Sequence, residues 1–482
     1  MEKQTSLPLL AATLTLTLAA CVIIPPVPPE IREQDKRNSF VAPKDTTFAA
    51  MPGLSIETDR WAGVLGGAGY RIEVPKTGWN GKLAVWAHGY AGNGNALTVQ
   101  NPPIRRYLIE SGFAWAASSY SKNYYDVRAG VEDTNALTLA FNSISAANGR
   151  TLAAASRTYL LGFSMGGHIA AAAVEAEVLA TARNKARYDG AVPMCGVLGD
   201  TELFDYFAAY QVAAQQLAGL PAAKFPYSQW NNVIANDVRT TLFNSTKSFA
   251  TPTAQGLRLK NIVMNLTGGP RPIFDEGFGF EAWHNGVWSV FGSSGVGTNG
   301  SAGGILAPNK NIVDTQRIRF RFDAAEPVVD AFNASIAHAT ADADANPLRT
   351  DGVRWIPKIN GEFKIPVLTL HTLGDIYVPF HMEQVYHQRA AAKGNTDHLV
   401  QRAIRAAGHC DFTVAEQVTA FADLVKWVES GIKPAGDDVL TASAIAAPDY
   451  GCAHTDNTVG VDDGALVKAW RAKGKLPACP AR

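Results

Sequence analysis

The sequence has no excess of charge of either sign. Among 482 residues it holds 43 basic and 43 acidic side chains, so the formal net charge is zero. Proteins that bind nucleic acid usually carry a clustered positive excess, because they neutralise phosphate groups. The sequence therefore predicts no nucleic-acid partner.

Long hydrophobic runs are missing from the body of the chain, and so are the common zinc motifs. After the N-terminal segment, no apolar run reaches the length that a membrane-spanning helix needs. Neither a CxxC nor an HExxH pattern occurs, and these spacings are typical of zinc ligands. We expect a soluble body without a metal site. With 47% apolar residues, that body can bury a large core.

The first residues have the features of an export signal. Lys3 precedes an apolar stretch at 7–20, which is too short to span a bilayer comfortably and ends in the small residues Ala19 and Ala20. We therefore expect residues 1–20 to be a signal peptide that is not part of the folded domain.

Cys21 follows the signal directly, and this arrangement resembles the lipobox of bacterial lipoproteins. The resemblance implies that Cys21 is acylated and becomes the new N-terminus. It implies an exported lipoprotein of the bacterial cell envelope, sorted to an outer membrane where the host has one, because Val22 rather than Asp follows. The protein would then contact the membrane only through its anchor, with a proline-rich spacer at 25–29. The alternative is an ordinary signal peptide followed by a chance cysteine.

Few cysteines remain in the body of the chain: Cys195, Cys410, Cys452 and Cys479. An even number of cysteines in an exported protein suggests disulfides. Four cysteines permit three connectivities, and spacing alone does not choose between them.

Short apolar runs alternate with helix-forming stretches through the first part of the chain. The runs at 83–87, 113–117, 158–163 and 190–194 are predicted to be buried strands. This alternation predicts a mostly parallel sheet with helices on both faces. It stops near residue 200 and resumes at 365–370, so the block between is expected to be an insertion in the sheet.

The last helix is marked by a capping box, Thr413-x-x-Glu416, and by Gly431 at its end. The expected organisation is therefore a signal peptide at 1–20, an anchor spacer and extension at 21–54, a core at 55–199 and 361–431, an insertion at 200–360, and a tail at 432–482.

The stretch GFSMGG at 162–167 places Ser164 between an apolar strand and a helix of small residues. This strand–turn–helix setting is the structural condition for a nucleophile elbow. Gly162 and Gly166 allow the close backbone approach that such a turn requires. The dipole of the following helix favours negative charge at Ser164. We therefore predict that Ser164 is a nucleophile.

A serine hydroxyl needs a base, and the base needs a carboxylate to orient it. In a nucleophile-elbow protein the chain order is serine, acid, histidine. His409 follows the last predicted strand, at roughly 399–404, at the sheet edge where ligands bind. Asp375 stands in a glycine turn after the preceding strand and is the favoured acid, with Asp200 as the alternative. Asp411 is too near His409 in sequence to be an obvious partner. The histidines expected to be structural are His168, His371, His381, His387 and His454.

Acyl transfer also requires two oriented N–H groups that bind the developing oxyanion. The residue after the nucleophile, Met165, should supply one of them. The second should come from the loop His88-Gly89-Tyr90, through the N–H of Tyr90.

Four motifs together resemble the α/β-hydrolase superfamily over about residues 55–431. They are His88-Gly89, Gly162-Phe-Ser164-Met-Gly166, Gly374-Asp375-x-x-Val-Pro379 and Gly408-His409. The resemblance implies the α/β-hydrolase fold with a large lid insertion. It also implies hydrolysis through an acyl-enzyme with no metal or organic cofactor. Ester cleavage is the expected reaction. An amidase or a C–C bond hydrolase of the β-diketone type would use the same triad, and a binding lipoprotein that reuses the fold is the non-enzymatic alternative.

Cys410, next to His409, resembles a feature of tannase and feruloyl-esterase relatives. In those proteins the cysteine after the catalytic histidine is bonded to one beside the catalytic serine. Phe163 occupies that second place here. The resemblance therefore suggests Cys195 as the substitute, and we hypothesise the pairs Cys195–Cys410 and Cys452–Cys479.

The predicted lid is rich in aromatic residues between 274 and 288. We expect Phe280, Trp283 and Trp288 to contact substrate. The alternative is that these rings form the core of the insertion itself. An exported hydrolase with such a lid would act on a small-molecule ester or a polymer fragment with apolar or aromatic groups.

Overall fold

The computed structural model describes residues 39–92, 94–220, 234–245, 249–289, 311–472 and 474–480, without the side chains of 281–283 and 289. The predicted signal peptide, the lipidation site Cys21 and the proline-rich spacer lie outside these residues. No helix within the described ranges is both long enough and apolar enough to cross a membrane.

The centre of the molecule is an eight-stranded sheet with the strand order β1-β2-β4-β3-β5-β6-β7-β8. Its strands are β1 (Thr58–Leu65), β2 (Ala68–Pro75), β3 (Lys82–Ala87), β4 (Ala114–Ser118), β5 (Arg157–Phe163), β6 (Gly190–Met194), β7 (Val367–Thr372) and β8 (Leu399–Ile404). Only β2 runs antiparallel to both of its neighbours, and the remaining pairs are parallel. This is the α/β-hydrolase fold that the four motifs implied.

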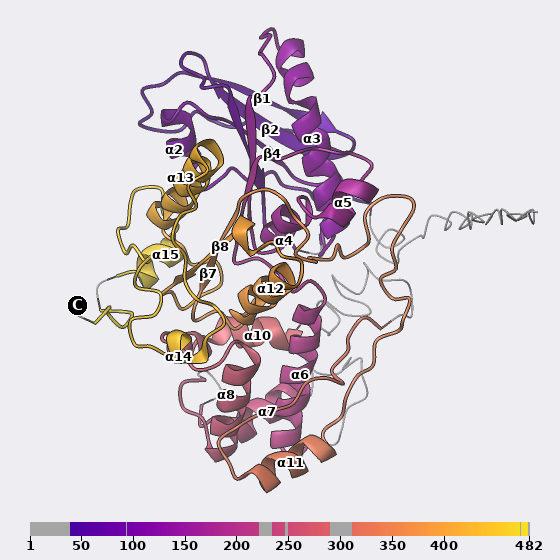
Figure 1. Ribbon diagram of the computed structural model, residues 1–482, viewed down its shortest axis with the longest axis vertical. Coiled ribbons are helices and arrows are strands. Elements are labelled where there is room, and N and C mark those ends of the chain that lie inside the picture. The colour runs from indigo at the N-terminus through magenta and orange to yellow at the C-terminus, as the bar shows by residue number, and fades with distance from the viewer. Residues whose placement is uncertain are drawn as a thin grey trace, which may run out of the picture.

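Helices cover both faces of the sheet (Figure 1). One face is covered by α3 (Val127–Ala147), α4 (Met165–Ala172), α5 (Ala176–Thr181) and α12 (His381–Ala392), and the other by α2 (Arg105–Glu110) and α13 (Val414–Ser430). Successive side chains of a strand point to opposite faces, so Val85 of β3 packs into one core and Trp86 into the other. Both faces are therefore apolar, which explains the continuous apolar runs in the sequence.

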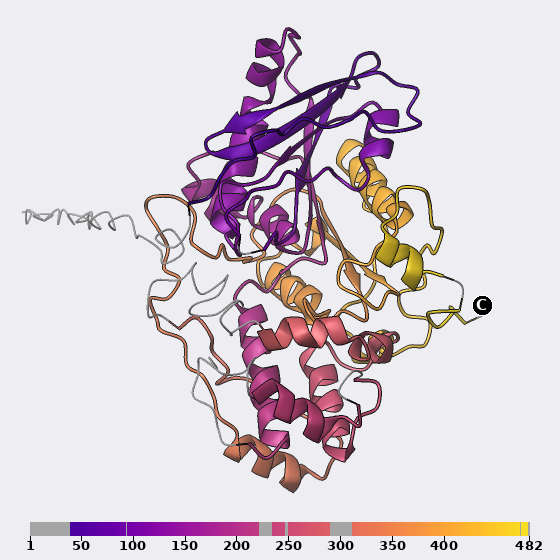
Figure 2. The same ribbon diagram turned by 180° about the vertical axis from the view of Figure 1, so that it is seen from behind.

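A group of helices separates β6 from β7 in the chain. It comprises α6 (Glu202–Leu217), α7 (Ala235–Leu242), α8 (Ala254–Leu266), α9 (Phe274–Phe278), α10 (Glu281–Ser289) and α11 (Glu326–Ser335). Figure 1 and the reverse view in Figure 2 show these helices gathered at one end of the molecule, beyond α12. The sheet is thus continuous across the insertion, because β6 pairs directly with β7.

The C-terminal segment packs back onto the core. It contains α14 (Ala442–Ile445) and α15 (Ala465–Trp470). Elsewhere, between α12 and β8, the chain forms a short 3₁₀ helix at Thr396–His398. Tyr450 joins Leu373 and Ala407 in a small apolar cluster beside the end of β7. Arg471 and Glu416 form a buried ion pair at 2.9 Å, so the residue after α15 is tied to the first turn of α13.

Candidate active site

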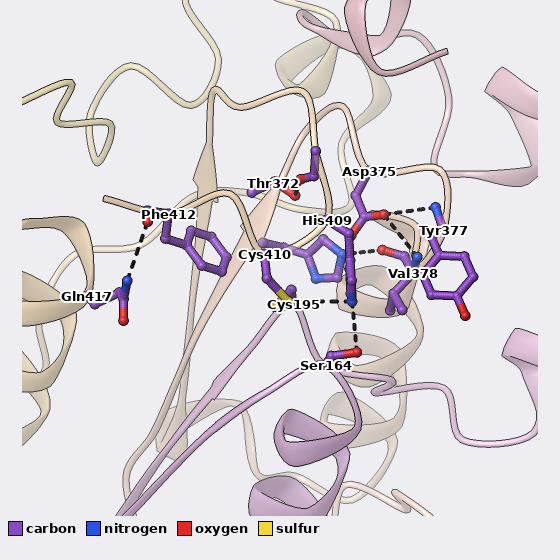
Figure 3. The surroundings of a disulfide bond; sticks show 12 residues. Ser164, Cys195, Thr372, Asp375, Tyr377, Val378, His409, Cys410, Phe412 and Gln417 are labelled. Atoms are coloured by element: carbon purple, nitrogen blue, oxygen red, sulfur yellow. Dashed lines mark hydrogen bonds and ion pairs between the residues drawn. A yellow bond between two sulfur atoms is a disulfide. The ribbon is translucent and has the colours of Figure 1, made fainter. Parts of the chain in front are cut away.

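Ser164, His409 and Asp375 form one hydrogen-bonded chain, although they are far apart in sequence (Figure 3). The Nε2 atom of His409 lies 2.8 Å from Ser164 Oγ. Its Nδ1 atom lies 2.6 Å from Asp375 Oδ2. Because the carboxylate can only accept, Nδ1–H donates to Asp375 and Nε2 is left to accept the proton of the serine hydroxyl.

Ser164 sits at the apex of a strained turn between β5 and α4. Its φ of 56° and ψ of −119° are uncommon for any residue other than glycine. A Cβ atom built on Gly162 would overlap the Gly166 carbonyl, and one built on Gly166 would overlap the Ala87 carbonyl. Only glycine fits these positions, so the G-x-S-x-G pattern is required by the turn itself. The serine is therefore held outward at the N-terminus of α4, where the helix dipole favours developing negative charge.

Asp375 is fully buried in the turn between β7 and α12. Its Oδ1 atom accepts hydrogen bonds from the backbone N–H groups of Tyr377 at 2.8 Å and Val378 at 3.0 Å. Its second oxygen is left for His409. The carboxylate is thus fixed by its own turn and oriented toward the imidazole.

His409 is held from two sides. Thr372, at the end of β7, donates from Oγ1 to the Gly408 carbonyl at 2.7 Å. On the other side a disulfide joins Cys410 to Cys195, which follows β6. The second disulfide joins Cys452 to Cys479 in the C-terminal segment. These are the two pairs that we hypothesised.

Cys195, Cys410 and His409 lie close enough together to resemble a metal-binding group, with their ligand atoms within 4.8 Å of one another. Both sulfur atoms are engaged in the disulfide, so no thiolate is available for a metal. This cluster is better understood as a covalent support for His409.

The alternative acids have other environments. Asp200 forms an ion pair with Arg389 at 2.6 Å and accepts from the Ile359 N–H at 3.0 Å. Asp411 is buried, and the groups that act on its carboxylate are the backbone of Gly408 and the charge of Arg471, not His409. Burial raises the pKa of Asp411 to about 6. Of the three carboxylates considered, Asp375 is the one that bonds to His409.

Two of the other candidate histidines are held by structural hydrogen bonds. His168 donates from Nε2 to the Pro357 carbonyl at 2.7 Å and accepts from the Tyr125 hydroxyl at 2.9 Å. His371 donates from Nε2 to the Val378 carbonyl at 2.7 Å. His381 and His387 lie on α12, and His454 lies in the C-terminal segment. His168 is thus a buried brace of α4 and not a second base.

The expected oxyanion site lies beside Ser164. Met165 is the first residue of α4, where backbone N–H groups have no intrahelical partner. A Cβ atom on Gly89 would lie 3.4 Å from the Ser164 Cβ, so the loop that carries Tyr90 runs against the serine. The placement of both residues is compatible with the two N–H donors that we predicted.

The aromatic residues of the insertion lie in different environments. Trp288 is buried and packs against Phe249, with ring centroids 5.1 Å apart. Phe280 packs edge-on against Trp470 of α15 at 5.1 Å. Trp283 lies in α10, but its side chain is outside the described residues. For Trp288 the structure favours the alternative interpretation, in which the rings form the insertion's own core.

Tyr377 was not identified from the sequence, although it lies only two residues after Asp375. Its ring packs edge-on against the His409 ring, with centroids 5.5 Å apart and an angle of 77° between the ring planes. It also stacks on the ring of Phe207 of α6, with centroids 5.6 Å apart. A Cβ atom on Gly286 of α10 would lie 3.0 Å from the same ring. Tyr377 therefore connects two insertion helices to the triad. Its position beside the acid was the only available sequence signal.

No family model matches the chain. Among curated proteins, the chain is similar to an o-phthalyl amidase from Xanthobacter agilis, with 32% identity over 88 residues, or 18% of this chain. The match spans 19% of that relative's length.

Solved structures similar to this chain include two esterases. Feruloyl esterase B from Aspergillus oryzae has a TM-score of 0.42 and 16% identity, over 79% of this chain and 82% of that chain. The Pyrococcus furiosus esterase Pf2001 has a TM-score of 0.37 and 11% identity, over 80% of this chain and 97% of that chain.

Proposed function

We propose that the chain is a serine hydrolase that cleaves carboxylic esters through an acyl-enzyme on Ser164. The hydrogen-bonded chain from Ser164 through His409 to the buried Asp375 carries this proposal. It provides a nucleophile, a base within reach of its proton, and a carboxylate that orients the base.

In the acylation half-reaction, Ser164 Oγ attacks the ester carbonyl while His409 Nε2 takes the hydroxyl proton. The N–H groups of Met165 and Tyr90 stabilise the oxyanion of the tetrahedral intermediate. The protonated His409 then gives its proton to the leaving alcohol, and the C–O bond breaks. Asp375 keeps its negative charge throughout and stabilises the imidazolium.

In the deacylation half-reaction, a water molecule takes the place of the alcohol. His409 accepts a proton from this water as its oxygen attacks the acyl carbonyl. Collapse of the second intermediate returns the proton to Ser164 and releases the carboxylic acid. Every proton is therefore carried by His409.

The substrate is proposed to be an apolar or aromatic ester. The supporting observation is the partly exposed ring of Tyr377, which lies beside His409 and packs on the buried Phe207. Aromatic side chains bury large apolar areas and favour ring-containing or aliphatic partners. Phe280 and Trp283 remain candidates for this surface.

Amide cleavage is the second candidate reaction. The observation that favours it is the short match to the o-phthalyl amidase. The same triad and oxyanion donors serve both reactions, because only the leaving group differs. Comparing p-nitrophenyl esters with p-nitroanilides of the same acyl groups separates them. We expect kcat/KM for the esters to be at least about 100-fold higher, corresponding to about 2.7 kcal/mol in the barrier. Higher values for the anilides would favour the amidase.

Export and lipidation at Cys21 are part of the proposal. They rest on the sequence before Cys21, and the two disulfides fit an oxidising compartment. Expression of the full chain in a bacterial host with radiolabelled palmitate should label the protein, whereas Cys21→Ala should remain unlabelled. Equal labelling of both chains, or of neither, would contradict lipidation at Cys21.

A further inference from the structure

Residues 271–277 of the insertion pack against the turn that carries Asp375, which we call the acid turn. A Cβ atom built on Gly277 would overlap the Gly374 carbonyl oxygen. Ile273 is buried in the same apolar cluster as Leu373 and has a φ of 69°. A positive φ is unusual for a β-branched residue and stores strain of order 1–3 kcal/mol. Such strain persists where surrounding contacts fix the backbone, so this segment is tightly built against the acid turn.

Arg271 extends a buried guanidinium from this segment to the acid turn. Its Nε donates to the Leu373 carbonyl at 2.6 Å, two residues before Asp375. Its two Nη atoms donate to the Gly269 carbonyl at 2.9 Å and to Thr267 Oγ1 at 3.1 Å. The ring of Phe274 lies 5.0 Å from its Cζ atom. Each of its three nitrogen atoms therefore donates to a neutral group.

Among the residues that the structure describes, no carboxylate lies within ion-pair distance of this guanidinium. A buried cation without a paired anion is costly, so its charge acts on the nearest anionic group. Asp375 is a carboxylate within Coulombic range. Burial lowers the pKa of Arg271 to about 10, which still leaves the group charged at neutral pH.

Other titratable groups near the acid turn and His409 come from several elements. They include Tyr206 of α6, His371 of β7, Tyr377 of the turn itself, Glu383 and His381 of α12, Asp411 of the loop after β8, and Tyr450 of the C-terminal segment. Burial lowers the pKa of His381 to about 3, so it is neutral. Burial opposes the charge of His371, but Glu383 raises its pKa above the usual value. His371 and Glu383 thus compensate each other, whereas the charge of Arg271 remains uncompensated.

We propose that Arg271 is a positioning residue for the triad: it holds the Asp375 turn through Leu373 and supplies the positive charge that keeps the Asp375–His409 pair in its reactive protonation state. This inference rests on the proposed serine-hydrolase function. A nearby positive charge favours an ionised Asp375 and disfavours a protonated His409. Both effects widen, toward lower pH, the range over which the pair is in its reactive state with a neutral imidazole.

The rate at which a fluorophosphonate labels Ser164 depends on neutral His409 and needs no knowledge of the substrate. In Arg271→Gln, the midpoint of the acidic limb of this rate should rise by about half a pH unit or more, because the charge is lost. Arg271→Lys keeps the charge and loses the planar fork, so its rate should fall while its midpoint stays within about 0.2 units. Arg349→Gln removes another buried guanidinium, which pairs with Asp351, and should leave the midpoint unchanged.

A second pair of variants leaves Arg271 in place. Gly269 has a φ of 88° and open space where a Cβ would stand, and its carbonyl accepts from the guanidinium. Asn and Asp tolerate this backbone conformation. Gly269→Asp adds a compensating carboxylate and should raise the midpoint relative to Gly269→Asn, which has the same shape. This comparison decides the question if the Arg271 variants do not fold.

The inference is overturned if Ser164 is labelled in the wild-type protein but neither Arg271→Gln nor Gly269→Asp moves the midpoint of the acidic limb of the labelling rate. It is also overturned if the Gln and Lys variants move the midpoint equally. A folded wild-type protein that is not labelled at all would instead contradict the proposed function.

Discussion

At the scale of single residues, the reactive serine depends on backbones that approach too closely for a side chain. The Ser164 N–H donates to the Met194 carbonyl at 3.0 Å, and its carbonyl accepts from the His168 N–H at 3.0 Å. These bonds hold a backbone conformation that costs of order 1–3 kcal/mol. The strain is sustained only because Gly162 and Gly166 let three chain segments meet.

Gly162→Ala tests this dependence. The new methyl group would overlap the Gly166 carbonyl, so the turn must open or the strand must shift. We expect a loss of about 2 kcal/mol or more in the free energy of unfolding, together with at least tenfold slower labelling of Ser164. Urea denaturation and labelling kinetics measure the two effects. Gly464→Ala, where a Cβ meets nothing within 4 Å, is the control. Equal behaviour of the two variants would show that the turn tolerates a side chain.

Asp205 of α6 gives a prediction about pH. Burial raises the pKa of its carboxyl to about 8, although the hydrogen bond from the Asp314 N–H acts in the opposite direction and lowers it. The unfolded value is about 4, so the folded protein holds a proton that the unfolded chain lacks between pH 4 and 8. The stability contributed by this group is fully present below pH 4 and is lost as the pH rises through 8.

Asp205→Asn cannot ionise, and it should therefore gain stability relative to the wild-type protein as the pH rises. The difference in the free energy of unfolding should grow by up to about 1.4 kcal/mol per pH unit across this window. Urea denaturation of both proteins at pH 5 and pH 8 measures this change. A difference that is the same at both values would contradict a protonated Asp205.

At the scale of elements, the loop between β8 and α13 carries His409 and is supported by covalent and hydrogen bonds. The Cys195–Cys410 disulfide spans 215 residues and connects this loop to the end of β6. Disulfides that close long loops restrict the unfolded chain strongly, with typical contributions of about 2–5 kcal/mol. Cys410 also directly follows His409, so the bridge acts on both stability and geometry.

Replacing Cys195 and Cys410 together with Ser should lower stability by about 2–5 kcal/mol and slow Ser164 labelling at least tenfold, because the His409 loop loses its anchor. The double replacement of Cys452 and Cys479 is the matched control. That bridge closes only 27 residues in the C-terminal segment, and its loss should leave the labelling rate within about twofold. If both double variants label at the wild-type rate, the first disulfide does not position His409.

Element-level features were predictable where the signal was local. The capping box at Thr413 and the strand before Ser164 were recognisable because their hydrogen bonds and apolar spacing lie within a few residues. The edge strand β1 was missed, because its burial alternates irregularly and one side lacks a neighbour. The environment of Trp288 could not be read either, since its packing partners come from α6 and from residues near 249.

At the scale of the whole molecule, the candidate site is assembled from distant segments. Ser164 follows β5, Asp375 follows β7 and His409 follows β8, so the parallel sheet brings the three to one edge. This convergence was predictable, because chain order and strand ends determine it.

The residues that support the site from outside the sheet could not be predicted from the sequence. Arg271 reaches the acid turn from the insertion, and Arg471 reaches the loop after His409 from the C-terminal segment. Such contacts depend on long-range packing that leaves no periodic signal.

The most direct test of the central claim is intact-mass measurement of the folded protein after exposure to a fluorophosphonate. We predict one adduct, located on the peptide that contains Ser164, and none in Ser164→Ala. Asp375→Asn should label at least about 1,000-fold more slowly, because the imidazole loses its orienting carboxylate. Asp200→Asn, checked for folding because it breaks the ion pair with Arg389, should label at nearly the wild-type rate. An unlabelled wild-type protein, equal labelling of Ser164→Ala, or a loss that follows Asp200 and spares Asp375 would contradict the proposed triad.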